Sequence, residues 1–208
     1  YKQSMMRKHT LASLLLATSL IFVSASLSHG ARQLFNGKNL DGWVIENNGQ
    51  FVVEDGILKI NQGTGWLRSV EEFGDFTLRM EFRFLEPDAN SGIFVRTGAA
   101  SADDDNGWPT NGYQIQCRDT LEGASPLAFM IPYGAPPFQV VSSREALTEA
   151  YRPTGEWNVY EITAQGEQLS VMLNGKLITL AIDIKNLTGH IGIQGEHGLL
   201  EFRKIEVE

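Results

Sequence analysis

The sequence predicts an all-β protein in which two antiparallel sheets pack as a sandwich. In several short stretches of the 208-residue chain, apolar and polar side chains alternate, the period expected of strands with one buried face. Helical periodicity is nearly absent, and the 21 glycines gather with other turn-forming residues between these stretches. The pattern gives roughly a dozen strands, which is enough for two packed sheets.

The first part of the chain is expected to be a signal peptide that lies outside the fold. Residues 11–23 (LASLLLATSLIFV) form an apolar run that is too short to span a membrane comfortably and follows the basic pair Arg7 and Lys8. Residues 1–4 are expected to precede the true start, and cleavage is expected near residue 30. These features favour export to the periplasm or the medium without a stable membrane anchor, with an uncleaved anchor as the alternative.

The remaining chain, residues 31–208, is expected to be a single domain with a substantial core. Residues 1–30 carry three basic residues and no acidic one, so their removal changes the formal net charge from -8 to -11. An acidic chain without a basic cluster is a poor nucleic-acid binder, and no nucleic-acid partner is expected. The only cysteine, Cys117, cannot form an internal disulfide and is expected to be buried and inert.

The expected elements follow an entry loop over residues 34–42, after which a strand begins at Trp43. The dipeptides Asp55-Gly56 and Asn174-Gly175 predict two-residue hairpin turns. Residues 120–153 contain several prolines and weak periodicity, so a long irregular loop with one short strand is expected there. The other strands are expected within residues 51–60 (a hairpin), 66–69, 76–84, 92–96, 113–119, 157–164, 168–173, 176–181, 190–194 and 199–207.

A polar loop is expected between Thr97 and Asn111, and it carries three adjacent acidic residues, Asp103 to Asp105. Three carboxylates could hold calcium, but the alternating ligand spacing of a known calcium loop is missing. A solvated loop is therefore the favoured interpretation.

Three strands between Asp75 and Asp119 carry the main functional prediction. If they share one sheet, the side chains opposite the core include three arginines and two amides, groups that make planar, multidentate hydrogen bonds. The residues expected on this face are Glu81, Arg83, Arg96, Gln114, Gln116 and Arg118. The two interpretations are an open, concave ligand-binding face with Asp119 and His197 at its rim, or an ordinary solvated face.

An ordered set of motifs then extends over the mature chain. The set is LFNGKNLDGW, VEDGIL, DFTLRMEFRF, NSGIFVR, GYQIQCRD, GEWN, LNG and the closing GHIGIQG and GLLEFRKIEV. In this order the motifs resemble the 3-keto-disaccharide hydrolase family, long described as a bacterial domain of unknown function. The resemblance implies a jelly-roll sandwich of the concanavalin A-like lectin and glucanase type, exported by bacteria that degrade glycans.

The sequence departs from the family pattern in the third central strand. Gln114 stands where the family has a glutamate, while Gln116 and Asp119 match as they stand. An amide cannot ionise, so any acid–base role of that glutamate would be lost. If the missing carboxylate limits turnover, Gln114→Glu is expected to raise activity, and an unchanged activity would make Gln114 a binding residue with the base elsewhere. His197 corresponds loosely to a family histidine that follows the glutamine of a late strand, here Gln194.

The resemblance implies chemistry at a ketone carbon of a sugar ring. A base removes the proton at C2 beside the 3-keto group, the resulting enolate expels the leaving group at C1, and water adds back. The candidate bases are Glu81, Asp119 and His197. The candidate enolate stabilisers are Arg83, Arg96 and Arg118, and the candidate hydroxyl-binding residues are Gln114, Gln116 and Gln194.

Each candidate has a simpler alternative: Arg96 could form a surface salt bridge with Glu81, and His197 could be a solvated turn residue. If Arg96 instead lies on a sugar-binding face, Arg96→Ala is expected to weaken binding or turnover by about 1–3 kcal/mol and to leave the melting temperature nearly unchanged. No cofactor is evident, but a divalent metal held by histidine and carboxylates stays an open alternative although no ligand motif with diagnostic spacing occurs.

Two functions remain, both with a carbohydrate partner. One is an exported lyase or hydrolase that acts on 3-keto-glycosides, and the other is a carbohydrate-binding module without turnover. An ordinary retaining glucanase is disfavoured, because no E-x-D-x-x-E or E-x-D-x-E string places two carboxylates across a glycosidic bond.

Overall fold

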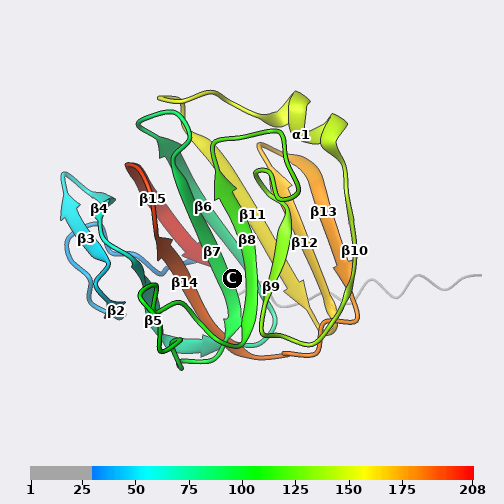
Figure 1. The fold of residues 1–208 in the computed structure, drawn as a ribbon, viewed down its shortest axis with the longest axis horizontal. Helices are drawn as coiled ribbons and strands as arrows, with labels where there is room; N and C mark the ends of the chain where they lie inside the picture. The colour runs from blue at the N-terminus through cyan, green and yellow to red at the C-terminus, as the bar shows by residue number, and fades with distance from the viewer. Residues whose placement is uncertain (1–29) are drawn as a thin grey trace, which may run out of the picture.

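The computed structural model describes residues 30–208, which fold into two antiparallel sheets packed face to face (Figure 1). This arrangement confirms the predicted all-β sandwich. The expected signal peptide lies almost wholly in residues 1–29, outside the described part of the chain. Within residues 30–208, no helix is long and apolar enough to cross a membrane.

The larger sheet has nine strands in the order β10-β13-β12-β11-β6-β15-β4-β3, with β1 paired to β15. Its central strand β6 (Phe76–Phe84) alternates as predicted, so that its apolar side chains enter the core. The other strands are β1 (Arg32–Gln33), β3 (Gln50–Glu54), β4 (Ile57–Gln62), β10 (Gln139–Ser142), β11 (Asn158–Gln165), β12 (Gln168–Leu173), β13 (Lys176–Ile182) and β15 (Leu200–Val207).

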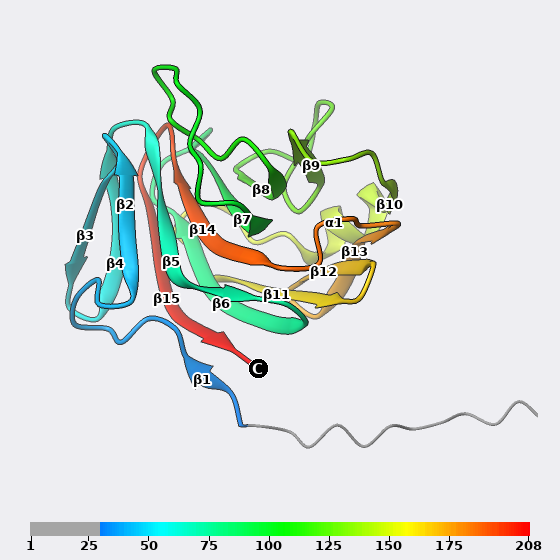
Figure 2. The same cartoon turned by 90° about the horizontal axis from the view of Figure 1, so that it is seen from below.

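The smaller sheet has six strands in the order β2-β5-β14-β7-β8-β9. They are β2 (Trp43–Asn47), β5 (Gly65–Phe73), β7 (Asn90–Thr97), β8 (Gly112–Arg118), β9 (Met130–Tyr133) and β14 (Gly189–Gly195). Figure 2 shows this sheet above the larger one, with the loop between β7 and β8 standing out from its far side. The face of the smaller sheet that points away from the larger sheet is called its outer face below.

The core between the sheets is apolar and rich in aromatic rings. Phe82 of β6 lies 4.6 Å from Tyr160 and 5.6 Å from Phe84, measured between ring centroids. Cys117 is fully buried in this core, as predicted, and burial raises its pKa well above the usual thiol value. Each large side chain buried here contributes about 2 kcal/mol to folding.

Both hairpin predictions agree with the backbone. Asp55 and Gly56 have φ of 52° and 80°, and Asn174 and Gly175 have 49° and 83°. Positive φ at both central residues is the geometry that matches the twist of antiparallel strands. Asn174 also anchors its turn, since its Oδ1 accepts from Val159 N at 2.8 Å.

The expected sharing of one sheet by the three central strands is wrong. β6 belongs to the larger sheet, whereas β7 and β8 belong to the smaller one. After Phe84 the chain crosses to the opposite layer, and Asn90 begins β7 there. Alternation determines which side chains of a strand face the core, but it does not determine which of the two sheets the strand joins.

The segment over residues 120–153 is more structured than predicted. It contains β9, β10 and one short helix, α1 (Arg144–Ala150). Ser143 caps the helix, because its side chain accepts a hydrogen bond from Ala146 N at 3.1 Å. Leu147 and Ala150, three residues apart, lie on the buried side. About two turns of helix are too short to produce a periodic pattern in the sequence.

Candidate functional site

Four amide side chains from three neighbouring strands meet on the outer face of the smaller sheet. Gln114 and Gln116 come from β8, Gln194 from β14 and Asn90 from β7, and we call these four the amide cluster. The three glutamines are 0–8% exposed, yet four atoms of the cluster are buried without a hydrogen-bond partner. These atoms are Asn90 Oδ1, Gln114 Oε1, Gln116 Oε1 and Gln194 Nε2.

Unpartnered buried amides are rare, because each costs about 1–3 kcal/mol of desolvation. Four on one face of one sheet, aimed from adjacent strands, are the feature of this fold that calls for a ligand. A polyhydroxylated molecule supplies both the donors and the acceptors that such groups lack. The amide cluster is therefore the candidate binding site.

A glycine makes this arrangement sterically feasible. Gly92 of β7 is paired with Gln116 and lies between β14 and β8. A Cβ at this position would lie 1.7 Å from Gln114 Nε2. Because that space is empty, the Gln114 side chain reaches across β7, and its Nε2 donates to Gln194 Oε1 at 2.6 Å.

Replacing Gly92 by alanine tests this role of the glycine. We expect a loss of about 1 kcal/mol of unfolding free energy, the usual value of one buried hydrogen bond, because the new methyl group displaces the Gln114 amide. Gly98→Ala is the control, since a Cβ there meets nothing within 4 Å. Urea unfolding measures both, and equal stabilities for the two variants would contradict the close approach described here.

Aromatic side chains surround the amide cluster. Tyr133 of β9 packs edge-on against Phe94 with ring centroids 5.3 Å apart, and its ring lies 6.2 Å from that of Trp108. The Trp108 Nε1 donates to Gly195 O at 3.2 Å, which brings the β7–β8 loop against β14. Trp66 packs against Phe94 and donates from Nε1 to Ser101 Oγ of the same loop at 3.1 Å. Aromatic faces beside amides are a usual lining for ring-shaped polar ligands.

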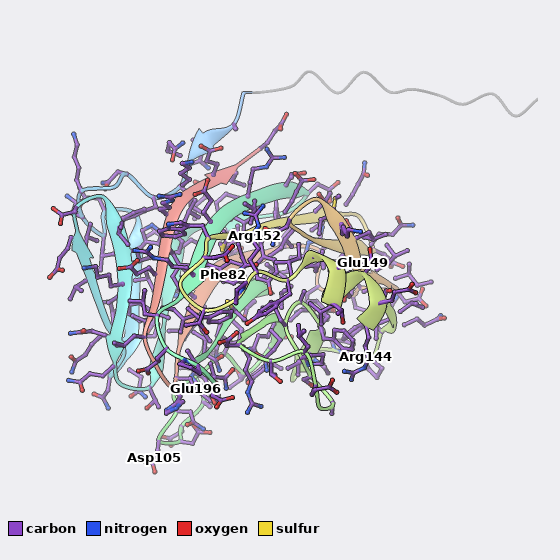
Figure 3. The ribbon with its side chains drawn as sticks, turned by 90° about the horizontal axis from the view of Figure 1, so that it is seen from above. Phe82, Asp105, Arg144, Glu149, Arg152 and Glu196 are labelled. Carbon is purple, nitrogen blue, oxygen red and sulfur yellow. The ribbon has the colours of Figure 1, made fainter. Side chains whose placement is uncertain are left out.

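One carboxylate, Glu196, adjoins the amide cluster. It follows Gln194 by two residues and lies on the side of the molecule that carries the Asp105 loop (Figure 3). Burial raises the pKa of Glu196, and the Asn90 amide, Arg118 and His197 only partly offset this effect. A carboxylate with a raised pKa is a stronger base than an ordinary glutamate, so Glu196 can accept a proton from a bound molecule.

Tyr133 shares this environment. Burial and the nearby charge of Glu196 raise the pKa of the Tyr133 phenol, while the Gln194 amide lowers it. The phenol therefore stays protonated at neutral pH and can only donate or accept hydrogen bonds as a neutral group.

The structure brings five of the nine predicted site residues to this face. Gln114, Gln116 and Gln194 belong to the amide cluster itself. Arg118 pairs with Asn90 across β8 and β7, and its charge acts on Glu196 together with that of His197, which is exposed. The other four predicted residues lie elsewhere.

Glu81 and Arg83 lie on the outer face of the larger sheet, so the predicted common face with Gln114 does not exist. Glu81 accepts 2.6 Å hydrogen bonds from Arg203 Nε and Lys204 Nζ. Burial opposes ionisation of Glu81, but these two partners outweigh it and hold its pKa below the usual value. Arg83 donates to Glu201 at 2.6 Å. Ion pairs of this kind explain both residues without a ligand.

Arg96 is fully buried at one end of the sandwich and does not face outward as predicted. Its φ of 47° lies in the left-handed region, beside a register shift between His190 and Gly192 of the neighbouring strand β14. This bulge interrupts the alternation and redirects the side chain. The guanidinium then donates to Gly74 O, Gly166 O and Asn186 O and to the Asp75 carboxylate, and so joins three loops.

Asp119 is part of a polar clamp at the end of β8. Its Oδ1 accepts from Tyr151 Oη at 2.5 Å, and its Oδ2 accepts from Thr154 Oγ1 at 2.6 Å. Burial and the carboxylate together raise the pKa of Tyr151. Both oxygens of Asp119 are therefore committed to holding the segment after α1, which favours a structural role over a catalytic one.

Sequence reasoning missed Glu196, Asn90, Tyr133 and Trp108. The alternation that placed Gln194 outward also places Glu196 outward, so this signal was present in the sequence. Tyr133 and Trp108 lie on irregular or weakly periodic segments, where no pattern assigns a side chain to a face.

No metal centre is evident in residues 30–208, where no three histidine, cysteine or acidic side chains are grouped closely enough to hold an ion. In the β7–β8 loop, Asp104 Oδ1 accepts from the backbone of Asn106 and Gly107, both at 2.9 Å. This carboxylate shapes its own turn.

Comparison with known protein families identifies the family of this chain. The family described as the 3-keto-alpha-glucoside-1,2-lyase-like domain matches residues 30–208. The chain belongs to this family. The resemblance noted from the motifs is thereby confirmed. Comparison with curated proteins gives no match.

Solved structures share the fold of this 3-keto-alpha-glucoside-1,2-lyase-like domain. A proposed glycosyl hydrolase from Parabacteroides distasonis ATCC 8503 is 24% identical with a TM-score of 0.63, over 86% of this chain and 98% of that one. The carbohydrate-binding module CBM66 from Bacillus subtilis is 16% identical with a TM-score of 0.53, over 80% and 95%. A β-glucanase from Bacillus licheniformis is 13% identical with a TM-score of 0.50, over 86% and 98%. These likenesses confirm the predicted jelly-roll fold of lectins and glucanases.

Proposed function

We propose that this protein is an exported lyase or hydrolase that cleaves 3-keto-glycosides on the outer face of the smaller sheet. The observation that carries the proposal is the amide cluster, in which each of four amides has one buried atom without a hydrogen-bond partner, beside a carboxylate with a raised pKa. Membership of the 3-keto-alpha-glucoside-1,2-lyase-like family supports the substrate class. The apolar run over residues 11–23 after Arg7 and Lys8 supports export.

In this proposal Glu196 is the base that removes the C2 proton. The 3-keto group acidifies that proton, and the electron pair left on C2 is delocalised onto the ketone oxygen as an enolate. Collapse of the enolate breaks the C1–O bond and releases the aglycone, and water then adds to the unsaturated sugar. A base with a raised pKa lowers the cost of the first step, which is the step that needs the protein most.

The neighbours of Glu196 supply the groups that stabilise the enolate, transfer protons and bind the sugar ring. The Arg118 guanidinium is the nearby positive charge that favours the negatively charged enolate. His197 is exposed beside Glu196 and is suited to exchange protons with solvent and the leaving group. The amide cluster holds the ring hydroxyls, and Tyr133 and Trp108, packed edge to face on each other, supply aromatic surface beside the cluster for the apolar side of the ring.

A carbohydrate-binding module without turnover is the second candidate, favoured by one observation. Gln114 takes the place of a family glutamate and is bound to Gln194, so that position has no base. The fold shared with CBM66 from Bacillus subtilis is consistent with this function. In this alternative the amide cluster binds sugar and Glu196 contributes only a hydrogen bond.

One experiment separates the two functions. The purified protein is incubated in D₂O with a 3-keto-disaccharide and, in parallel, with the unoxidised parent disaccharide. A lyase is expected to release monosaccharide from the first substrate only and to introduce deuterium at C2, because C2–H is broken in the proposed step. Binding of either sugar without product and without exchange would leave the binding module as the function.

A further inference from the structure

Among the atoms of the amide cluster that lack a hydrogen-bond partner, acceptors outnumber donors. Three of them, Asn90 Oδ1, Gln114 Oε1 and Gln116 Oε1, can only accept a hydrogen bond. One, Gln194 Nε2, can only donate. The ligand that satisfies all four must therefore donate at several points and accept at one.

We propose that Gln194 reads the ketone oxygen of the sugar and that Gln114 is the positioning residue that turns its nitrogen toward the ligand. A ketone oxygen accepts hydrogen bonds but never donates, so it matches a free amide nitrogen and is repelled by a free amide oxygen. The hydroxyls on the two flanking carbons donate to the free oxygens of Gln114 and Gln116. The inference rests on the proposed function and names the residues that select the oxidised sugar over its parent.

The orientation of Gln194 follows from its contact with Gln114. Because Gln114 Nε2 donates to Gln194 Oε1 at 2.6 Å, the oxygen of Gln194 is engaged, and its nitrogen, which has no partner within hydrogen-bond geometry, lies on the side of the Tyr133 hydroxyl. The empty space at Gly92 permits this contact, and Gln114 and Gln194 are too buried for bulk water to hydrogen-bond to them in place of a ligand. A buried polar group left against the wrong partner rejects a ligand strongly, since neither group can be solvated.

The pairing also gives a reason for an amide at position 114. A carboxylate there could only accept, so Gln194 would have to turn its nitrogen inward and present its oxygen to the ligand. On this view Gln114→Glu lowers the preference for the ketone, which is the opposite of the gain in activity expected from the family pattern alone.

The test measures the ratio of two dissociation constants by calorimetry, for a 3-keto-disaccharide and for its unoxidised parent. All variants carry Glu196→Gln to suppress turnover, and the ratio is measured from about pH 7 to pH 10, because burial raises the pKa of an introduced carboxyl and the acceptor-only form is reached at the upper end of this range. Gln194→Glu and Gln114→Glu are each expected to shift the ratio about tenfold or more toward the parent sugar, whose hydroxyl can donate to the new acceptor. Gln168→Glu, at an exposed position on β12, is the matched control and should leave the ratio unchanged.

The outcomes separate this inference from the proposed function. An unchanged ratio in both carboxylate variants overturns the inference, even where Glu196→Gln has abolished turnover. A shifted ratio supports it, even where the unmodified protein proves to bind without cleaving. If Gln194→Glu fails to fold, Gln114→Glu decides, and failure of the 3-keto-disaccharide to bind the protein with its native amides overturns the inference.

Discussion

Replacing Glu196 by glutamine is expected to lower kcat/KM for a 3-keto-disaccharide by at least about 100-fold, the usual loss when a general base is removed. The side chain keeps its size and its contact with Asn90 but can no longer accept the C2 proton. Folding should survive, because burial disfavours the charged form that the substitution removes. Product release and C2 deuterium exchange should fall together, while the melting temperature should not decrease.

The matched control for this variant is Glu81→Gln. Glu81 is a partly buried glutamate on the opposite outer face, held by Arg203 and Lys204. It should leave kcat/KM within a factor of about two, and its loss of surface ion pairs should cost at most about 1 kcal/mol. A large loss of activity in Glu81→Gln with a normal rate in Glu196→Gln would place the reaction on the larger sheet and refute the site described here.

The pH profile gives a second readout for Glu196. The base works only when ionised, so the rate should fall as the pH decreases through the pKa of this carboxyl. Because burial raises that pKa above the usual glutamate value, the acid limb should lie at a higher pH than an exposed glutamate would give. In Glu196→Gln, any residual rate should lose this limb.

Replacing Arg96 by alanine is expected to destabilise the fold by about 3–5 kcal/mol, because it removes a large, fully buried side chain together with its hydrogen bonds. The change leaves three backbone carbonyls at Gly74, Gly166 and Asn186 without the donor that joins them. This result differs from the sequence expectation of an unchanged melting temperature. Equilibrium unfolding in urea measures it directly.

Arg79→Ala is the control for the arginine substitution. Arg79 lies on the exposed face of β6 and forms an ion pair with Glu161, with 61% of its side chain exposed. Exposed pairs contribute about 0–1 kcal/mol, so the loss in this variant should be small. Similar losses in the two variants would show that the buried network at Arg96 does not hold the loops together.

The alternation in the sequence predicted the strands because it follows directly from burial of one strand face. It placed Phe76–Phe84 and Tyr113–Cys117 correctly relative to the core. It did not predict the layer, because a turn near residue 85 that carries the chain across the sandwich looks like any other turn. Glu81 and Gln114 were therefore expected on one face and lie on two.

Alternation also predicted part of the candidate site. Gln114, Gln116 and Gln194 lie on regular strands, and simple alternation turned them outward. Arg96 also lies on a strand, but the bulge that redirects it is a feature of pairing with β14, which the local sequence does not encode. Tyr133 reaches the site through the fold of a segment with almost no pattern.

The separation of the two outer faces has a practical consequence for attachment of the protein to a solid support. The six strands of the smaller sheet contain no lysine, whereas Lys59, Lys176 and Lys204 all lie on strands of the larger sheet. Amine-reactive linkers would therefore couple to the larger sheet and to loops. A protein immobilised in this way should present the amide cluster to the medium, and resin-bound protein should retain the sugar affinity of the free form.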